Sequence, residues 1–397
     1  MGIGYIDGTM MDAEELKNIR KKLHTNPEIS GSEQWTRNII LDFLSTCQPT
    51  QLIEPVAGTG ILCVFDSLKP GPCIIFRAEL DALPITEQNT FEHVSTNSGI
   101  SHACGHDGHM SILLGLARFL SENIKQLTGK IVLLFQPAEE NATGAKHIMQ
   151  DSRFHDLKPM YVFGFHNIPA YLLGSIIINQ TVFASASQGV IIRFHGKTSH
   201  AGHPEEGINP LPYLLQSIQI LNTISKEYSE KTPGSFITII HMNLGEQAFG
   251  TSPGEAVLMA TLRSPDQQVM DDMANIILDR LSVALNEFQG TWDYEWVEVF
   301  PAIHNHKKSV SMIKKAAQSL DFEIINRESP FPWTEDFSYY LQKYNGAFFG
   351  LGAGLHHPQL HHPTYDFPDE LISYGVALCE KIIIQCIQSH SGDGGVS

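Results

Sequence analysis

A nine-residue stretch at positions 102–110, HACGHDGHM, holds three histidines, one cysteine and one aspartate. Cys104 and His106 stand two positions apart, so an extended or turning loop can point both side chains at one ion. A thiolate and an imidazole are good ligands for borderline-soft metals such as zinc. The apolar residues of the following SILLGLARFL recur at helical spacing, which predicts that the motif lies in a loop leading into a buried helix. A polar surface loop rich in histidine is the alternative interpretation.

Three further clusters offer ligands of the same kind. QPAEEN places Glu139 and Glu140 at the end of an apolar run, where two adjacent carboxylates imply a cation or a shifted pKa. FGFHNIP places His166 at the end of another apolar run. LHHPQLHHPTYDF offers further histidines, most of which must be bystanders: His356, His357, His361 and His362. Taken singly, each cluster has another interpretation. The paired glutamates suit an acidic surface turn, His166 suits a structural histidine bonded to backbone, and the C-terminal histidines suit a surface run. Together they suit two divalent ions that share one site.

The segments that carry these side chains have the pattern of an α/β fold. CIIFRAEL, IVLLFQPAEE and YVFGFHN are short β-branched and aromatic runs that end in polar residues, and helical patterns lie between some of them. They predict a sheet covered by helices, in which sites gather where the strands end. At the N-terminus, AEELKNIRKKLHTNPEIS predicts a helix that ends before Pro27, because proline disfavours helix for Asn26.

The middle of the chain has a different pattern and predicts a second domain. GVIIRFHGKTSH, SFITIIHMNLG and EAVLMATLRS predict strands, whereas NPLPYLLQSIQILNTI and DQQVMDDMANIILDRLSVALNEF predict long amphipathic helices. A compact sheet with helices on one face follows from this order. We therefore expect a first domain in two parts, residues 1–184 and 305–397, with a second domain inserted at residues 185–304.

The composition excludes several classes of protein. The chain has 397 residues with 26 basic and 43 acidic side chains, a formal net charge of −17, and no basic cluster, so nucleic acid is a poor partner. The longest apolar runs, such as IIIQCI, are too short to span a bilayer, and the first residues lack the basic and apolar regions of a secretory leader. The six cysteines have no repeated spacing, which indicates reduced thiols. We expect a cytoplasmic protein with no membrane partner.

Seven motifs follow one another nearly from end to end of the chain: IRKKLHTNPEIS, RAELDALPITE, HACGHDGHM, FQPAEE, FHGKTSHAGHPEEGINP, TEDFSYY and LHHPTYDF. In this order they resemble the metal-dependent N-acyl-amino-acid amidohydrolases, a family that includes plant auxin-conjugate hydrolases, hippurate hydrolases and aminoacylase-like metallopeptidases. The resemblance implies a two-domain α/β protein. Its metal-binding catalytic domain would contain a mixed sheet, and its inserted α+β domain would serve as a lid and in dimerisation.

The resemblance also assigns the metal ligands. By motif they fall on Cys104, His106, Glu140, His166 and the first histidine of HHPTYDF, His361. These residues would hold two divalent ions, zinc or manganese, and the family's general base falls on Glu139. The division of roles is chemically consistent, because a metal-bound Glu140 is locked as a carboxylate while Glu139 stays free to move a proton. Cys104 is assigned as a ligand, since a thiolate held by metal is a poor free nucleophile.

Five more positions bear on the implied site. Asp81 in RAELDALP resembles the acid that orients a ligand histidine, with a helix or turn cap as the alternative. Glu79 of the same motif stands where the family usually has aspartate. His200 resembles the histidine that reaches a partner subunit's active site and donates to the developing oxyanion, with an exposed loop histidine as the alternative. Arg263 stands where the family has an arginine suited to a substrate carboxylate, with a surface ion pair as the alternative. Gly250 replaces an asparagine common in the family.

The sequence thus predicts a dinuclear metal-dependent hydrolase that cleaves the amide bond of an N-acyl amino acid or a related small conjugate. We expect it to form a homodimer or a higher homo-oligomer. A small-peptide carboxypeptidase or dipeptidase would use the same metal chemistry with a different pocket. A two-domain ligand-binding protein that has lost hydrolysis is the non-enzymatic alternative. Glu139 argues against that alternative, because the residue that transfers the proton is the one such a protein would most easily lose.

Overall fold

The chain divides into two compact units. The computed structural model describes residues 9–393. The first unit joins the chain up to Phe183 to His304–Ser329 and to the chain from Glu335 onward. The second, which we call the inserted unit, comprises Ala184–Ile303 and Pro330–Thr334.

The short segment Pro330–Thr334 falls within residues 305–397, which the sequence pattern places in the first domain, yet it belongs to the inserted unit. The backbone explains its place in the inserted unit, because the Ser185 amide donates to the Phe331 carbonyl at 3.0 Å and Ala184 forms an isolated bridge with Phe331. Through this pairing, Pro330–Thr334 belong to the inserted unit, and the chain re-enters the first unit at Glu335.

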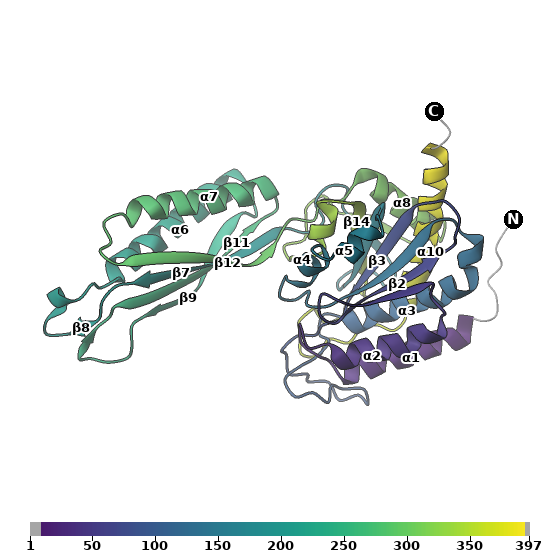
Figure 1. Cartoon of the computed structure of the whole chain (residues 1–397), viewed down its shortest axis with the longest axis horizontal. Coiled ribbons are helices and arrows are strands. Elements are labelled where there is room, and N and C mark those ends of the chain that lie inside the picture. The colour runs from purple at the N-terminus through teal and green to yellow at the C-terminus, as the bar shows by residue number, and fades with distance from the viewer. Residues whose placement is uncertain (1–8, 394–397) are drawn as a thin grey trace. The chain divides into compact units, whose positions relative to one another are not determined.

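A mixed sheet forms the centre of the first unit, as expected (Figure 1). Its strands, in spatial order, are β1 (Gln51–Val56), β2 (Gly60–Asp66), β4 (Lys130–Gln136), β3 (Cys73–Glu79), β5 (Tyr161–Ile168), β14 (Asn345–Gly352), β6 (Ile176–Ile178) and β13 (Ile324–Asn326). The central strands β4, β3, β5 and β14 run parallel to one another. The pairs β2 with β4 and β6 with β14 are antiparallel. The carboxyl ends of the four central strands therefore meet at one edge of the sheet.

Helices cover both faces of this sheet. They are α1 (Thr9–Thr25), α2 (Gln34–Thr46), α3 (His106–Asn123), α4 (Gly144–Ile148), α5 (Ser152–Asp156), α8 (Lys307–Gln318), α9 (Ser338–Leu341) and α10 (Leu371–Asp393), with a short 3₁₀ helix η1 (Ile124–Gln126) after α3. Because successive side chains of a strand point to opposite faces, Ile74 and Phe76 of β3 join the apolar core that includes α3 and α10. Ile75 and Arg77 point to the other face, where Arg77 reaches Asp336 just before α9.

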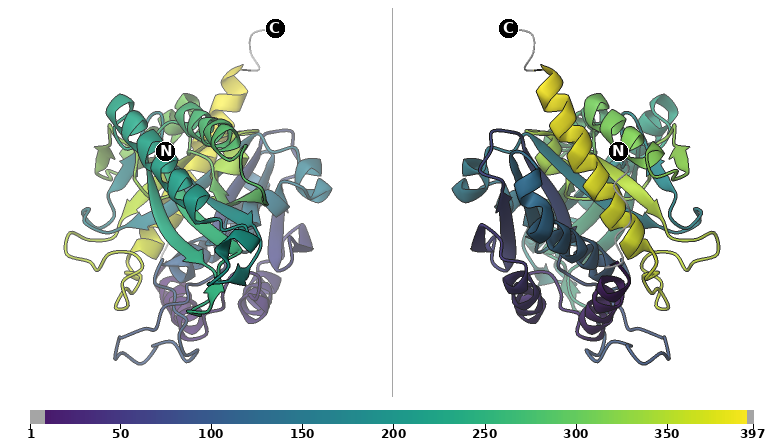
Figure 2. Two further views of the ribbon diagram at one scale, coloured as in Figure 1. Left: turned by 90° about the vertical axis from the view of Figure 1, so that its left-hand side faces the viewer. Right: turned by 90° about the vertical axis from the view of Figure 1, so that its right-hand side faces the viewer.

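Helix α10 is long and apolar enough, by length and composition, to cross a membrane. In the structure it packs against α3 and α8, and its side chains Leu378, Cys379 and Ile382 are fully buried in the core of the first unit. The right-hand view of Figure 2 shows α10, in yellow, running along the sheet on the same side as α3. These contacts are those of a core helix in a folded domain.

The inserted unit contains an antiparallel sheet in the order β12 (Thr291–Phe300), β7 (Ala186–His195), β11 (Glu255–Ser264) and β9 (Phe236–Leu244). Two long helices, α6 (Leu211–Lys231) and α7 (Gln267–Ala284), lie on one face of this sheet, as expected (Figure 1). Alternate residues of β11 are buried, and Leu258 and Leu262 belong to the core of this unit. Strand β8 (Ser199–His200) pairs with β10 (Thr251–Ser252) in a separate two-stranded ladder. The short 3₁₀ helix η2 (Pro204–Glu206) follows β8 in the chain.

Candidate metal centre

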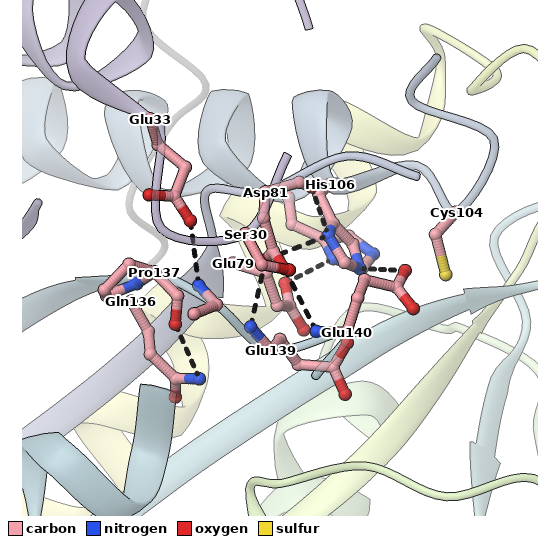
Figure 3. A network of polar contacts seen from close by, with 12 residues as sticks. Ser30, Glu33, Glu79, Asp81, Cys104, His106, Gln136, Pro137, Glu139 and Glu140 are labelled. Atoms are coloured by element: carbon pink, nitrogen blue, oxygen red, sulfur yellow. Dashed lines mark hydrogen bonds and ion pairs between the residues drawn. The ribbon is translucent and has the colours of Figure 1, made fainter. Parts of the chain in front are cut away.

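The carboxyl edge of the first unit's sheet brings the predicted ligands together. Strand β3 ends at Glu79 and strand β4 ends at Gln136, so Asp81 and the pair Glu139 and Glu140 leave neighbouring parallel strands at the same edge. The loop that holds Cys104 enters helix α3 at this edge. Figure 3 shows the Glu140 carboxylate turned toward the His106 ring, with Cys104 beside it.

The turn at Gly105, between the cysteine loop and helix α3, directs the side chains of Cys104 and His106 toward the same point. Gly105 has φ +87°, and a Cβ atom there would collide with the Asn167 side chain, so this tight turn requires glycine. His106 follows as the first residue of α3. The Sγ atom of Cys104 lies 3.3 Å from Nε2 of His166, which projects from strand β5. Ligand atoms of Cys104, His106 and His166 all lie within 4.8 Å of one another, and all three residues are buried.

The remaining predicted ligands complete a second, overlapping group. Cys104, Glu140 and His361 also present ligand atoms within 4.8 Å of one another. Oε1 of Glu140 lies 3.9 Å from Nε2 of His106 and 3.9 Å from Nε2 of His361. The backbone amide of His361 donates to the Ala103 carbonyl at 2.8 Å, which ties the C-terminal histidine segment to the cysteine loop. The structure therefore gathers all five sequence-predicted ligands into one cluster.

The neighbouring histidines of the C-terminal motif point elsewhere. Nε2 of His357 donates to the Asp366 carbonyl at 2.6 Å. Nδ1 of His362 pairs with the Thr364 hydroxyl at 2.8 Å. The expectation that most of these histidines are bystanders agrees with this geometry, since of the four only His361 lies in a ligand group.

The electrostatics of the cluster suit a cation. Nε2 of His106 and Oε1 of Glu140 are buried without a hydrogen-bond partner among the described residues. Burial of such polar atoms costs free energy unless a hydrogen bond or a metal ion satisfies them. Burial raises the pKa of Glu140 to about 7, although His106 opposes this shift. Burial and the nearby Glu140 raise the pKa of the Cys104 thiol well above its usual range. Burial and His109 lower the pKa of His166 far below its usual range, so its ring is neutral and able to bind a metal. The donor set thus fits a metal.

Asp81 orients this cluster through its backbone and its side chain separately. The Asp81 carbonyl pairs with Nδ1 of His106 at 2.8 Å, whereas its carboxylate Oδ1 lies 3.8 Å from that nitrogen. The carboxylate instead accepts from the backbone amides of Glu139 at 3.1 Å and Glu140 at 3.0 Å, and from the Ser30 hydroxyl at 2.7 Å (Figure 3). The main chain thus fixes the His106 ring, and the Asp81 side chain caps the turn that presents the two glutamates.

A buried arginine beneath the cluster was not anticipated from the sequence. Arg77 of strand β3 contacts Glu79, donates to Glu335 at 2.8 Å and to Asp336 at 2.6 Å, and reaches Gln136 through Nε at 2.9 Å. Burial raises the pKa of Glu139 well above its usual range, and Glu335 and Glu140 raise it further. A charged residue inside the apolar run CIIFRAEL and the adjacent acids of TEDFSYY were the available signals in the sequence.

Glu79, which stands in place of the family's aspartate, binds His109. The Asn167 amide donates to Nε2 of His109 at 3.2 Å, so Nδ1 carries the proton and donates to the Glu79 carboxylate at 2.7 Å. Burial raises the pKa of Glu79, but Arg77 and His109 outweigh it and hold the pKa well below the usual range. Both ring nitrogens of His109 are therefore engaged, although Glu79, His106 and His109 lie close enough to form a ligand group.

Two predicted residues lie in the inserted unit. His200 is exposed on strand β8, opposite Thr251, and its Nδ1 accepts from the Gly202 amide at 3.0 Å. Arg263 lies near the end of β11, where Nη1 donates to the Pro332 carbonyl at 2.8 Å, and burial lowers its pKa.

Comparison with known proteins identifies similar chains over nearly the whole length. Residues 75–385 match the family model described as Peptidase family M20/M25/M40. An N-acetyl-L-cysteine deacetylase of Bacillus subtilis is 31% identical over 90% of this chain and 85% of its own length. The IAA-amino acid hydrolase ILR1-like 2 of Arabidopsis thaliana is 30% identical over 96% of this chain and 87% of its own length. A Bacillus subtilis structure described as a dinuclear metal binding peptidase from the M20 family superposes with a TM-score of 0.78 at 23% identity, covering 95% of this chain and 99% of that one.

Proposed function

The chain belongs to peptidase family M20/M25/M40 and is a hydrolase, and from this premise we propose that it cleaves the amide bond of N-acyl amino acids or related small amide conjugates. One observation carries the proposal: five ligand side chains converge beside Glu139, a buried glutamate that is adjacent in sequence to one of the ligands. The substrates named for the two sequence relatives, an N-acetylated amino acid and an IAA-amino acid, share this chemistry.

Two divalent ions would be held by the five clustered side chains, Cys104, His106, Glu140, His166 and His361. When bound, such ions polarise an amide carbonyl and lower the pKa of water to about 7. The thiolate favours zinc and the carboxylate admits manganese, so we propose one of these two metals. The N-terminal and C-terminal parts of the first unit, which both supply ligands, form the proposed catalytic domain.

Glu139 would transfer the proton. Its side chain is 5% exposed, and the Asp81 carboxylate holds its backbone amide in place. Burial raises the pKa of Glu139 most, and the carboxylates of Glu335 and Glu140 raise it further. A raised pKa suits a carboxylate that accepts a proton from the attacking water and then passes it to the leaving nitrogen. A carboxylate bound to metal has no such freedom, which assigns Glu140 to the ligands and Glu139 to the base.

We further propose a homodimer formed by the inserted unit. Strand β9 lies at the edge of its sheet and pairs, among the described strands, with β11 alone. Ile240 and Met242 on this strand are 61% and 62% exposed, and Leu215 of the adjacent α6 is 54% exposed. Apolar side chains on an open edge are usually covered, and two copies related by a two-fold axis would cover one another.

In this dimer His200 would donate a hydrogen bond to the developing oxyanion in the partner subunit's site. The planar guanidinium of Arg263 would bind the carboxylate of the amino-acid part of the substrate through two parallel hydrogen bonds. The cysteines are all unpaired and buried, which suits a reducing compartment such as the cytoplasm.

A substrate panel tests the proposed reaction. The purified protein is assayed with N-acetyl amino acids, N-benzoyl amino acids and dipeptides, each with added zinc, with added manganese and after chelation. We expect metal-dependent hydrolysis with the N-acyl amino acids turned over fastest. Preferential cleavage of dipeptides would favour the carboxypeptidase or dipeptidase alternative, and tight binding without turnover in every metal would favour a binding protein.

The ligand assignment predicts which histidines matter for metal content. Replacement of Cys104, His106 or His166 by alanine should weaken metal binding by at least about tenfold, because even residues that only orient a ligand typically contribute 10- to 100-fold. His357→Ala and His362→Ala serve as controls, since both side chains bond elsewhere. Metal content by elemental analysis after dialysis distinguishes the two sets, and full occupancy in Cys104→Ala would remove the thiolate from the proposed centre.

The proposed role of His200 predicts complementation between two inactive variants. When Glu139→Gln and His200→Ala dimers exchange subunits freely, half of the dimers are mixed and each has one intact site, so activity should recover to about a quarter of the wild-type value. A mixture of Glu139→Gln with the double variant Glu139→Gln/His200→Ala is the control and should stay inactive. Proven subunit exchange without recovery in the first mixture would mean that His200 does not act across the interface.

A further inference from the structure

The motif IRKKLHTNPEIS places two charged side chains of α1 in the protein interior, outside the ligand cluster. Arg20 is 1% exposed and His24 is fully buried. Burial of charged groups is costly unless they are paired and hydrogen-bonded. The partners of Arg20 and His24 therefore indicate what these residues do.

Arg20 joins the two segments that carry ligands from opposite ends of the chain. Its Nη1 donates to the Asp107 carboxylate at 3.2 Å and to the Asp366 carboxylate at 2.5 Å, and its Nε donates to Asp369 at 2.8 Å. Asp107 directly follows His106, and Asp366 lies five residues after His361. One guanidinium from the first helix thus links the start of α3 to the C-terminal histidine segment.

His24 supplies a second cation to the same carboxylate. Its Nδ1 donates to Asp107 at 2.8 Å and its Nε2 donates to Glu87 at 3.1 Å, and a ring that donates from both nitrogens is protonated. Burial opposes this charge, but Asp107 and Glu87 raise the pKa of His24 to about 9. Asp107, although fully buried, is accordingly held as an anion between two cations.

The histidine segment contacts the cysteine loop and the start of α3 directly as well as through Arg20. The His361 amide donates to the Ala103 carbonyl at 2.8 Å, and Phe367 at the other end of the segment packs against Gly108 and the His109 ring. Asp366, held by Arg20 and by His93 at 3.2 Å, is the charged fixed point on that segment. Two fixed points flank the short run from His361 to Asp366 and restrict where the exposed His361 ring can lie.

We propose that Arg20 is a positioning residue that fixes His361 relative to Cys104 and His106 through Asp107 and Asp366, and thereby sets the metal affinity of the centre. The inference rests on the proposed metal centre and deepens it. The hydrogen-bond partners of Arg20 among the described residues are Asp107, Asp366, Asp369 and His93 and not the ligand side chains, so it acts on the two segments that bear the ligands. Positioning of this indirect kind typically contributes about 10- to 100-fold to metal affinity.

Two carboxylates on the same guanidinium provide a matched pair of variants. Asp366 and Asp369 have side chains 29% and 20% exposed, and each accepts one hydrogen bond from Arg20. Asp366 belongs to the histidine segment, whereas Asp369 lies just before α10. Asp366→Asn and Asp369→Asn therefore each weaken one contact of Arg20 at similar burial, and only Asp366→Asn also weakens the second anchor of the histidine segment, the contact of Asp366 with His93 at 3.2 Å. Arg20 itself is a poor target, because its removal would disturb three carboxylates at once, including the fully buried Asp107.

Zinc affinity of the full-length, chelator-treated protein is measured by competition with a chromophoric chelator, alongside its thermal midpoint. We expect Asp366→Asn to weaken zinc binding by about tenfold or more and Asp369→Asn by less than about threefold, with similar midpoints for the two apo variants. Equal zinc affinity in Asp366→Asn and wild type, or an equal loss in both variants, overturns the positioning role. Failure of the wild-type protein to bind zinc or manganese would instead overturn the proposed metal centre.

Discussion

Glu139→Gln should retain its metal ions and lose turnover by about 10² to 10⁴, the usual contribution of general acid–base catalysis. Glutamine has nearly the same shape and keeps the backbone contact with Asp81, but its amide cannot accept the proton of the attacking water. The loss should fall on kcat, because the substitution leaves the metal ligands and Arg263 unchanged. Steady-state kinetics combined with elemental analysis of the same preparation measures both quantities.

The adjacent residue supplies the matched control. Glu140→Gln changes the same chemical group one position along the chain, yet it should lower metal content and activity together, because Glu140 faces His106 and His361. A metal-replete Glu139→Gln enzyme with near-normal kcat would refute the assignment of the base. Loss of metal from Glu139→Gln and its retention in Glu140→Gln would exchange the roles of the two glutamates.

Much of the ligand cluster could be predicted because its members follow strands or precede a helix. Apolar runs such as IVLLFQPAEE predict buried parallel strands, and parallel strands bring their carboxyl ends to one edge. Cys104 and His106 were identified from ligand type and spacing, and the motif order resembled a family of metal-dependent amidohydrolases. The match to Peptidase family M20/M25/M40 and the similarity to a deacetylase confirm the family and the hydrolase class. The mixed sheet is confirmed as well.

Other features depend on contacts that no local pattern contains. Strand β12 went unrecognised, because TWDYEWVEVF mixes acidic and aromatic residues along a strand with much of its surface exposed. The division of labour within Asp81, in which the carbonyl holds His106 and the carboxylate caps the glutamate turn, requires coordinates. The same holds for Arg77, whose partner Asp336 lies 259 positions away in sequence.

Arg77 leads to the largest expected effect on stability. Its side chain is fully buried and shared among three carboxylates, those of Glu79, Glu335 and Asp336. Removal of one partner from a buried ion pair leaves uncompensated charge and typically costs about 3–5 kcal/mol. Arg77→Met, which fills similar space without a charge, should therefore lower the free energy of unfolding by about that amount, measured by guanidinium denaturation of the metal-free protein.

Two further variants separate the charge from the packing. Arg118→Gln removes a half-buried arginine that lies over the Phe43 ring and pairs with the exposed Glu15 at 3.0 Å, and ion pairs near the surface contribute at most about 1 kcal/mol. Adding Glu335→Gln and Asp336→Asn to Arg77→Met should restore part of the lost stability, because neutral amides of the same shape no longer require the guanidinium. If Arg77→Met unfolds within about 1 kcal/mol of wild type, the carboxylates beneath the cluster are balanced by protonation, and Arg77 is not their counterion.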